Sequence, residues 1–118
     1  MIAIELFHNE DRYDVFEQGR TIFREGDAGA TMYVVLNGSV TLSVKNHVVE
    51  ELGPGGVLGE MALLDSEPRS ATAVAVTECR LVPIDRKRFT FLIQQTPNFA
   101  LQIMRVIADR LRRMDQRL

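Results

Sequence analysis

The chain has 118 residues, of which 46% are hydrophobic and 25% are charged, and its formal net charge is −2. This size and composition suit a single domain over residues 1–118 with one apolar core, and the charge excludes a general attraction to nucleic acid or to an anionic membrane. With Cys79 as the only cysteine, an intramolecular disulfide and a cysteine-based metal cage are excluded, so we expect Cys79 to be a core or strand side chain.

Residues 13–85 are predicted to form short strands separated by turns. Val40, Leu42 and Val44 alternate with polar residues, which is typical of a strand with one buried face. Asn37-Gly38 predicts a hairpin. Further turn signals occur at Gly19, residues 26–29, Lys45-Asn46 and residues 53–56. Closely spaced turns favour an antiparallel, jelly-roll-like β-roll over a parallel sheet.

Residues 86–118 are predicted to form two helices, the second one long, which gives a mainly β fold with C-terminal helices. Asp85 can cap a helix from Arg86 to about Gln95. The inward residues of this helix would be Phe89, Leu92 and Ile93. Pro97 is suited to the first turn of the next helix, with Thr96 as its N-cap.

The long helix carries an apolar stripe with heptad spacing. Its members are Ala100, Met104, Ile107, Leu111, Met114 and Leu118, flanked by Phe99, Ile103 and Val106. So wide a stripe favours two partners, the helix's own barrel and a second copy of the chain, which predicts a homodimer through residues 100–118. Packing on its own domain alone, or contact with an unidentified effector protein, are the alternatives.

Residues 59–72 combine groups that suit a ligand with both a hydroxyl and a phosphate. Arg69 can donate two parallel hydrogen bonds to a phosphate, and Ser70 adds a hydroxyl. Residues 60–64 can form one helical turn whose first N–H groups are free to meet an anion. Glu60 would repel a phosphate, but it can accept from a ribose hydroxyl. The alternative is a surface loop in which Glu60 and Arg69 form an ordinary ion pair.

The same segment resembles the phosphate-binding cassette of the cyclic nucleotide-binding domain family, whose pattern is Gly-Glu-x-Ala-Leu followed by Arg-(Ser/Thr/Ala)-Ala. Residues 59–63 and 69–71 match every fixed position. Residues 23–27, 32–40 and 89–118 also resemble the early strands, the glycine turn and the two C-terminal helices of that family. The family includes bacterial catabolite activators, kinase regulatory subunits and nucleotide-gated channels.

The resemblance implies a role for each position. Glu60 would accept from the ribose 2′-hydroxyl, and Arg69 would pair with the cyclic phosphate. The other positions implied in binding cyclic AMP or cyclic GMP are Val49, Leu52, Leu58, Gly59, Met61, Ala62, Ser70, Ala71, Leu111 and Met114, with Arg110 or Arg113 as further candidates to close over the base.

Two departures from the family pattern concern packing and base selectivity. Leu58 stands where the family usually has an aromatic residue. Residues 111–115 contain no serine or threonine of the kind that contacts adenine in catabolite activators. The missing hydroxyl leaves base selectivity open, and Ser70 after the cassette arginine is compatible with cyclic AMP and does not exclude cyclic GMP. We predict a cyclic nucleotide, with cyclic AMP placed before cyclic GMP.

Other chemistry is poorly supported. His8 and His47 are isolated, so neither a catalytic triad nor a metal site is expected, and a haem role for His47 is a remote alternative. Five arginines against two aspartates at residues 105–118 could form a nucleic-acid patch, but a solvated helix face is the simpler interpretation.

The sequence thus predicts a regulatory sensor rather than an enzyme, without metal or cofactor, that signals by moving its last helix. No apolar run approaches the roughly 18 residues that span a bilayer and no secretory signal is evident, so we expect a cytoplasmic protein with no membrane partner and no direct nucleic-acid binding. The alternatives are a ligand-free dimerisation scaffold, a cupin-like barrel enzyme, or a fragment of a larger transcription regulator.

Overall fold

The computed structural model describes residue 7 and residues 12–117, with side chains as far as residue 113. In this part of the chain the elements are β1 (Asp14–Phe16), β2 (Thr21–Phe23), β3 (Thr31–Asn37), β4 (Val40–Val44), β5 (His47–Leu52), β6 (Val57–Leu58), α1 (Glu60–Asp65), β7 (Thr72–Ala75), β8 (Cys79–Asp85), α2 (Arg86–Gln95) and α3 (Pro97–Arg117). Strands up to residue 85 and helices after it agree with the sequence prediction, as does the short helical turn at α1.

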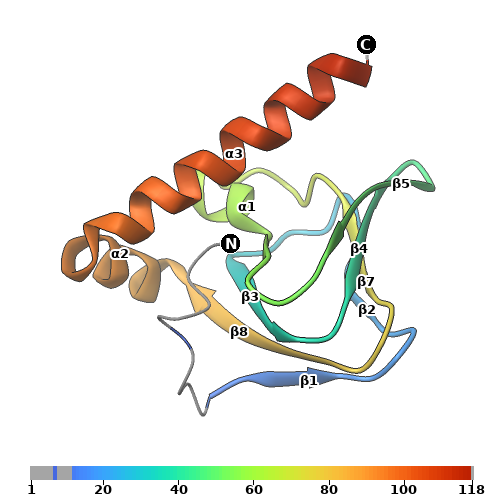
Figure 1. Ribbon diagram of the computed structural model, residues 1–118, viewed down its shortest axis with the longest axis horizontal. Coiled ribbons are helices and arrows are strands. Elements are labelled where there is room, and N and C mark those ends of the chain that lie inside the picture. The colour runs from blue at the N-terminus through green and yellow to red at the C-terminus, as the bar shows by residue number, and fades with distance from the viewer. Residues whose placement is uncertain (1–6, 8–11, 118) are drawn as a thin grey trace.

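The strands form two antiparallel sheets that face each other as a β-roll (Figure 1). One sheet has the order β1-β8-β3-β6 and the other the order β2-β7-β4-β5. Every pairing between neighbours is antiparallel, which confirms the predicted antiparallel roll.

The predicted hairpin at Asn37-Gly38 is wrong. The chain does turn there, but β3 pairs with β6 and β8, whereas β4 pairs with β5 and β7, so the turn carries the chain from one sheet to the other. A true hairpin joins β4 and β5 at Lys45 and Asn46, whose φ angles of 51° and 68° are those of a tight left-handed turn.

The apolar core has two layers because neighbouring residues of β3 point to opposite faces of its sheet. Met32 and Val34 point toward the helices, where they pack with Phe99 and Ile103. Tyr33 and Val35 point into the roll, in the layer between the two sheets. The predicted core role of Cys79 is confirmed, since it is fully buried in this second layer.

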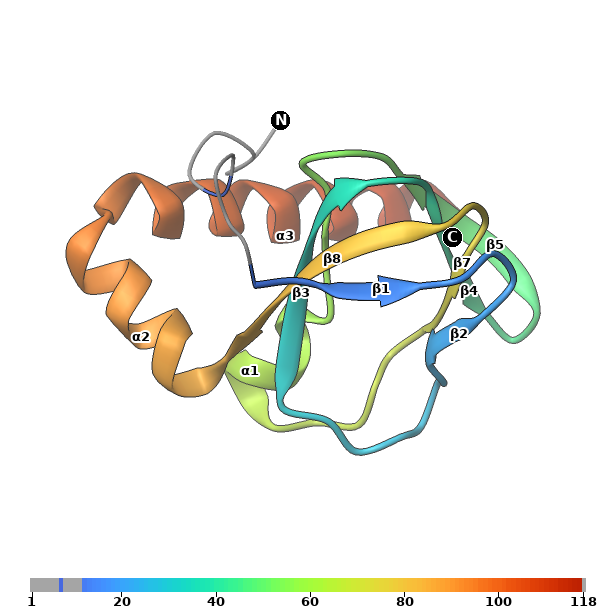
Figure 2. The same ribbon diagram turned by 90° about the horizontal axis from the view of Figure 1, so that it is seen from below.

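Helices α2 and α3 lie along one side of the roll (Figure 2). Asp85 caps α2 as predicted, accepting from the Arg88 N–H at 2.8 Å. Phe89 and Leu92 are buried against the sheet, as expected. Helix α3 begins at Pro97 and continues to Arg117, so that its last turns extend beyond the strands (Figure 1).

Candidate functional site

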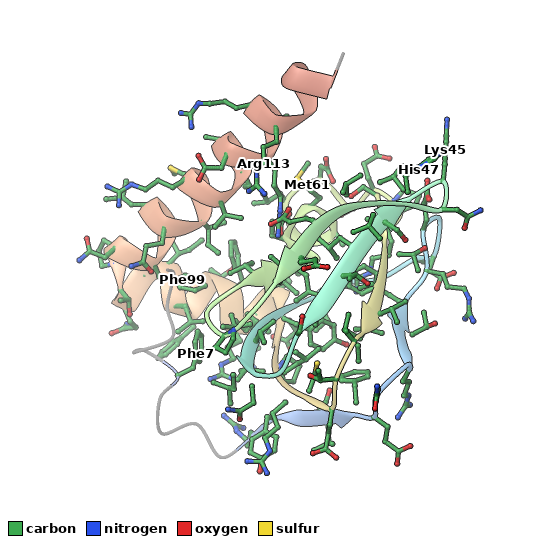
Figure 3. All side chains as sticks on the ribbon, turned by 45° about the vertical axis from the view of Figure 1, so that its right-hand side comes forward. Phe7, Lys45, His47, Met61, Phe99 and Arg113 are labelled. Atoms are coloured by element: carbon green, nitrogen blue, oxygen red, sulfur yellow. The ribbon has the colours of Figure 1, made fainter. Side chains whose placement is uncertain are left out.

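A cavity of about 400 Å³ lies between α1, the sheet that contains β4 and β5, and the far half of α3. The residues that line it are Phe23, Leu42, Val44, Val49, Glu50, Gly59, Glu60, Met61, Ala62, Arg69, Ser70, Ala71, Arg110 and Arg113. Met61 and Arg113 approach each other where α1 faces α3 (Figure 3). The cavity therefore has one apolar side, contributed mainly by the strands, and one charged side.

The backbone of Arg69 is held in place by the loop at residues 26–27. Its N–H donates to the Asp27 carbonyl at 2.8 Å, and its carbonyl accepts from the Gly26 N–H at 2.8 Å. The guanidinium lies over the ring of Phe23, with its central carbon 4.2 Å from the ring centre. Because the backbone and the aromatic ring both constrain Arg69, its guanidinium has a defined position in the cavity wall.

The Arg69 guanidinium is buried without a carboxylate partner among the described residues. Its side chain is only 8% exposed, and its one hydrogen bond to a described residue runs from Nη1 to the Gly59 carbonyl at 3.3 Å. Its Nε is buried and has no hydrogen-bond partner in the part of the chain that the structure describes. Burial lowers the pKa of Arg69, an effect that Tyr33, Asp27 and Glu60 partly offset. A buried cation of this kind is costly until an anion joins it.

Glu60 is the second buried charged residue of the cavity, at 4% exposure. Its Oε1 is paired with Nη1 of Arg110 from α3. The alternative in which Glu60 and Arg69 form an ordinary ion pair is therefore not what the structure shows, because the carboxylate is bound to a different arginine. The pKa of Arg110 is raised: burial alone would lower it, but Glu60 and Glu50 outweigh that effect.

Helix α1 is fixed at both of its ends. Gly59, just before the helix, has a φ of 80°, a left-handed conformation that glycine adopts without strain. At the other end, the Arg86 guanidinium donates to the Leu63 carbonyl and, at 3.2 Å, to the Ser66 hydroxyl. A basic residue suits the partial negative charge of a helix C-terminus, so Arg86 helps to set where Glu60 and the first N–H groups of α1 lie.

Most of the predicted site residues line this cavity. Those that do are Val49, Gly59, Glu60, Met61, Ala62, Arg69, Ser70 and Ala71. Leu52 and Leu58 instead lie in the core between the sheets, at 8% and 0% exposure. Leu111 is 56% exposed, and the Met114 side chain lies outside the described residues.

Three apolar wall residues were not predicted: Phe23, Leu42 and Val44. Alternation along β4 predicts that Leu42 faces inward, but it does not predict that Leu42 lines a cavity. Glu50 was also missed, because a charged residue on a strand is ordinarily solvated and nothing nearby in the sequence marks it as a partner of α3. The suggestion that Arg110 or Arg113 closes over the site is consistent with the structure, in which both line the cavity.

Other predicted features lie away from the cavity. His47 is exposed at the tip of the β4–β5 hairpin (Figure 3). Among the described residues, no group of three or more His, Cys, Asp or Glu side chains is arranged to hold a metal ion. Within the same residues, no helix has the length and apolar character needed to cross a membrane.

Sequence comparison identifies relatives that match most of this chain. The "Cyclic AMP receptor protein" of Thermus thermophilus is 38% identical over 109 residues, which are 88% of this chain and 50% of that protein. The "CRP-like cAMP-activated global transcriptional regulator" of Mycobacterium tuberculosis is 32% identical over 108 residues, or 87% of this chain and 48% of that protein. The chain thus spans about half the length of these relatives.

Structural comparison gives the same result. The crystal structure of Thermus thermophilus catabolite activator protein superimposes with a TM-score of 0.83 at 34% identity, covering 97% of this chain and 56% of that one. The model of the family described as "Cyclic nucleotide-binding domain" matches residues 13–96, which contain both sheets, α1 and α2. The chain therefore belongs to the cyclic nucleotide-binding domain family.

Proposed function

We propose that this domain is a regulatory sensor, not an enzyme, that binds a cyclic purine nucleotide and prefers cyclic AMP to cyclic GMP. Two relatives that cover most of the chain carry cyclic AMP in their names. The preference for cyclic AMP rests on these names, and Ser70, the serine after the cassette arginine, is compatible with it.

The observation that carries the proposal is the buried Arg69 guanidinium, which has no carboxylate partner within the described part of the chain and lies in the same cavity as the buried Glu60. In this proposal the cyclic phosphate neutralises Arg69, and the ribose 2′-hydroxyl donates to Glu60. Ser70, Gly59 and the backbone near Met61 and Ala62 surround the phosphate and ribose.

The charges around the cavity favour a ligand with a single negative charge. Glu50 and Glu60 face three guanidinium groups, those of Arg69, Arg110 and Arg113. Four of these five groups are joined in ion pairs through the two glutamates, which leaves Arg69 as the unbalanced charge. A cyclic phosphodiester carries one negative charge, whereas an open phosphomonoester carries about 1.5 to 2 at neutral pH. The cavity therefore suits the cyclic ligand better than the corresponding monophosphate.

The base would occupy the apolar side of the cavity, between Val49, Leu42 and Val44 on the strands and α3 on the other side. Contact of Leu111 and Met114 with the base remains a prediction. The predicted direct contact of Leu52 and Leu58 with the nucleotide finds no support in this cavity, because neither residue lines it. Since Arg110 of α3 is bound to Glu60, occupation of the ribose site acts directly on the attachment of α3. The nucleotide would signal by favouring one position of α3 over another.

Replacing Arg69 with alanine tests the proposal. We expect Arg69→Ala to lose about 2–5 kcal/mol of binding free energy, since one partner of a desolvated charge pair is removed. Titration calorimetry with cyclic AMP, cyclic GMP and 5′-AMP measures the loss. The matched control is Arg112→Ala, because Arg112 is 71% exposed and pairs only with Asp109 among the described residues. Equal affinity of Arg69→Ala and the unsubstituted protein for the cyclic nucleotides would remove Arg69 from the site.

A second candidate function, dimerisation through α3, rests on a different observation. Met104 and Leu111 belong to the predicted heptad stripe and are 62% and 56% exposed. Exposed apolar residues repeated along one helix face favour a second copy of the chain as the partner. Dimerisation through Met104 is compatible with nucleotide binding, because Met104 does not line the cavity. A scaffold without ligand would dimerise in the same way but bind no nucleotide.

A further inference from the structure

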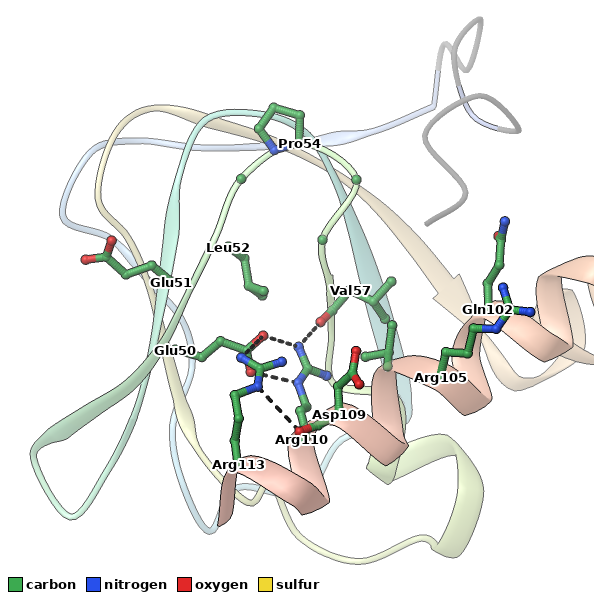
Figure 4. A pocket seen from close by; sticks show the side chains of 14 residues that line it. Glu50, Glu51, Leu52, Pro54, Val57, Gln102, Arg105, Asp109, Arg110 and Arg113 are labelled. Atoms are coloured by element: carbon green, nitrogen blue, oxygen red, sulfur yellow. Dashed lines mark hydrogen bonds and ion pairs between the residues drawn. The ribbon is translucent and has the colours of Figure 1, made fainter. Parts of the chain in front are cut away.

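Glu50, a residue of strand β5, forms ion pairs with two arginines of α3, Arg110 and Arg113 (Figure 4). Its Oε1 lies 2.9 Å from Nε of Arg110, and its Oε2 lies 3.4 Å from Nη2 of the same residue. Oε2 also lies 3.6 Å from Nη1 of Arg113. The Glu50 side chain is only 12% exposed, so these pairs are less screened by solvent than surface ion pairs are. Glu50 separates the nucleotide cavity from a groove of about 430 Å³ beside the β5–β6 turn, and it lines both.

The far half of α3 depends on these polar contacts. Ile103 is the last fully buried apolar residue of the described part of the helix, at 3% exposure. Val106 and Ile107 are partly buried against the same core. Beyond them, the polar contacts that join the described side chains of α3 to the roll are those of Arg110 and Arg113 with Glu50, and of Arg110 with Glu60 and the Val57 carbonyl. The position of the last described turns is thus set by ion pairs and hydrogen bonds.

Arg110 is shared between two carboxylates, and its donors are divided between them. Nε and Nη2 face Glu50, whereas Nη1 faces Oε1 of Glu60. Among the described residues, Oε2 of Glu60 accepts no hydrogen bond, which leaves this oxygen for a hydroxyl. If Glu50 lost its charge, Arg110 would keep Glu60 as its one carboxylate partner and could engage both oxygens in the bidentate geometry that arginine favours.

We propose that Glu50 is a positioning residue for the nucleotide: it holds Arg110 so that Arg110 occupies one oxygen of Glu60 and leaves the other for the ribose 2′-hydroxyl. This inference rests on the proposed function, because it assumes that Glu60 receives the ribose. Glu50 touches the nucleotide in no step of this scheme and acts through Arg110.

The test compares cyclic AMP with 2′-deoxy cyclic AMP on the Glu50→Gln protein. We expect Glu50→Gln to weaken cyclic AMP by about tenfold, the effect of losing one hydrogen bond to a charged group, and to change 2′-deoxy cyclic AMP by less than about twofold. The control is Glu51→Gln, whose side chain is exposed on the neighbouring position of β5, and both ligands should bind it as they bind the unsubstituted protein. Equal losses for both ligands on Glu50→Gln, or no loss for either, would overturn the inference.

A measurement without ligand separates this inference from the proposed function. Amide hydrogen exchange at residues 108–113 of the ligand-free protein should be faster in Glu50→Gln than in Glu51→Gln, since the far half of α3 loses a tether. Unchanged exchange would overturn the role of Glu50. If the unsubstituted protein binds neither nucleotide, the proposed function fails, and the positioning role fails with it, whereas exchange still decides whether Glu50 tethers α3. If Glu50→Gln does not fold, the ligand comparison and the hydrogen-exchange measurement are made on Glu50→Asp, which keeps the charge on a shorter side chain. The results that support or overturn the inference are the same as for Glu50→Gln.

Discussion

Arg69 occupies a space that two glycines leave open. A Cβ atom built on Gly29 would lie 2.5 Å from Nε and Nη2 of Arg69, and one on Gly59 would lie 2.7 Å from Nη1. Any side chain at these positions would displace the guanidinium. The cradle around the proposed phosphate partner therefore depends on the absence of side chains in two loops that are far apart in the sequence.

This geometry predicts the effect of a single added methyl group. Gly29→Ala should weaken cyclic nucleotide binding by about tenfold or more, because Arg69 must move away from its position over Phe23. The fold should persist, since the clash involves the flexible end of a side chain. Calorimetry and circular dichroism measure the two effects. Gly53→Ala is the control, because a Cβ there meets no atom within 4 Å. Unaltered affinity in Gly29→Ala would show that Arg69 does not need this space.

At this scale, the sequence predicted the site residues that are neighbours along the chain. Gly59, Glu60, Arg69 and Ser70 belong to one short segment with a recognisable pattern. Glu50 and Phe23 could not be found in the same way, because they meet that segment only when the sheets form. The unpaired state of Arg69 was equally beyond reach, since it depends on Glu60 having found Arg110 instead.

Helix α3 has two apolar strips that differ in burial. The heptad stripe was predicted as the main face, with Phe99, Ile103 and Val106 as a flanking strip. In the structure it is the flanking strip that packs on the core. Phe99 and Ile103 are 1% and 3% exposed, whereas Met104 of the heptad stripe is 62% exposed. Spacing predicts that both strips exist. Spacing does not predict which strip faces the sheet, because that depends on the orientation of α3 relative to α2.

The exposed face predicts the effect of a charge on α3. Met104→Glu should weaken self-association of the chain by about tenfold or more, because it places an unpaired carboxylate in an apolar seam. Sedimentation equilibrium over a range of concentrations measures this. The control is Gln94→Glu, at an exposed position on α2. If the unsubstituted chain stays monomeric at high concentration, the seam through residues 100–118 does not exist.

The strands show the limit of local signals more sharply. The sequence predicts turns at Asn37-Gly38 and at Lys45-Asn46, and both turns are present in the structure. Only the second joins neighbouring strands of one sheet, whereas the first passes between sheets. A dipeptide specifies the turn, but the pairing of β3 with β8 and of β4 with β7 is decided by apolar residues far away in the sequence.

For the whole molecule, the antiparallel roll followed by two helices was predictable because periodicity changes from two to about three and a half near residue 85. The sheet order was not, since β1 and β8, or β2 and β7, are joined by contacts between opposite ends of the roll-forming region. The β2-β7-β4-β5 sheet, α1 and α3 all contribute walls to the cavity, so its shape is a property of the assembled fold.

Because ligand binding is linked to folding, the nucleotide should stabilise the whole molecule. At a free concentration one hundred times the Kd, cyclic AMP should add about 2.7 kcal/mol to the free energy of unfolding. For a domain of this size that corresponds to a rise in Tm of roughly 10 °C. Differential scanning calorimetry measures the rise, which should disappear in Arg69→Ala. A Tm that does not respond to either cyclic nucleotide would contradict the proposed function.

The long overhang of α3 has a mechanical consequence. The helix is anchored in the core at Ile103, and its backbone continues to Arg117. At 1.5 Å per residue this arm is about 21 Å long. A tilt of about 10° about Ile103 would shift the helix axis at Arg110 by about 2 Å and at Arg117 by nearly 4 Å. In the proposed signalling scheme, a small displacement at the ion pairs of Arg110 would thus be about doubled at Arg117.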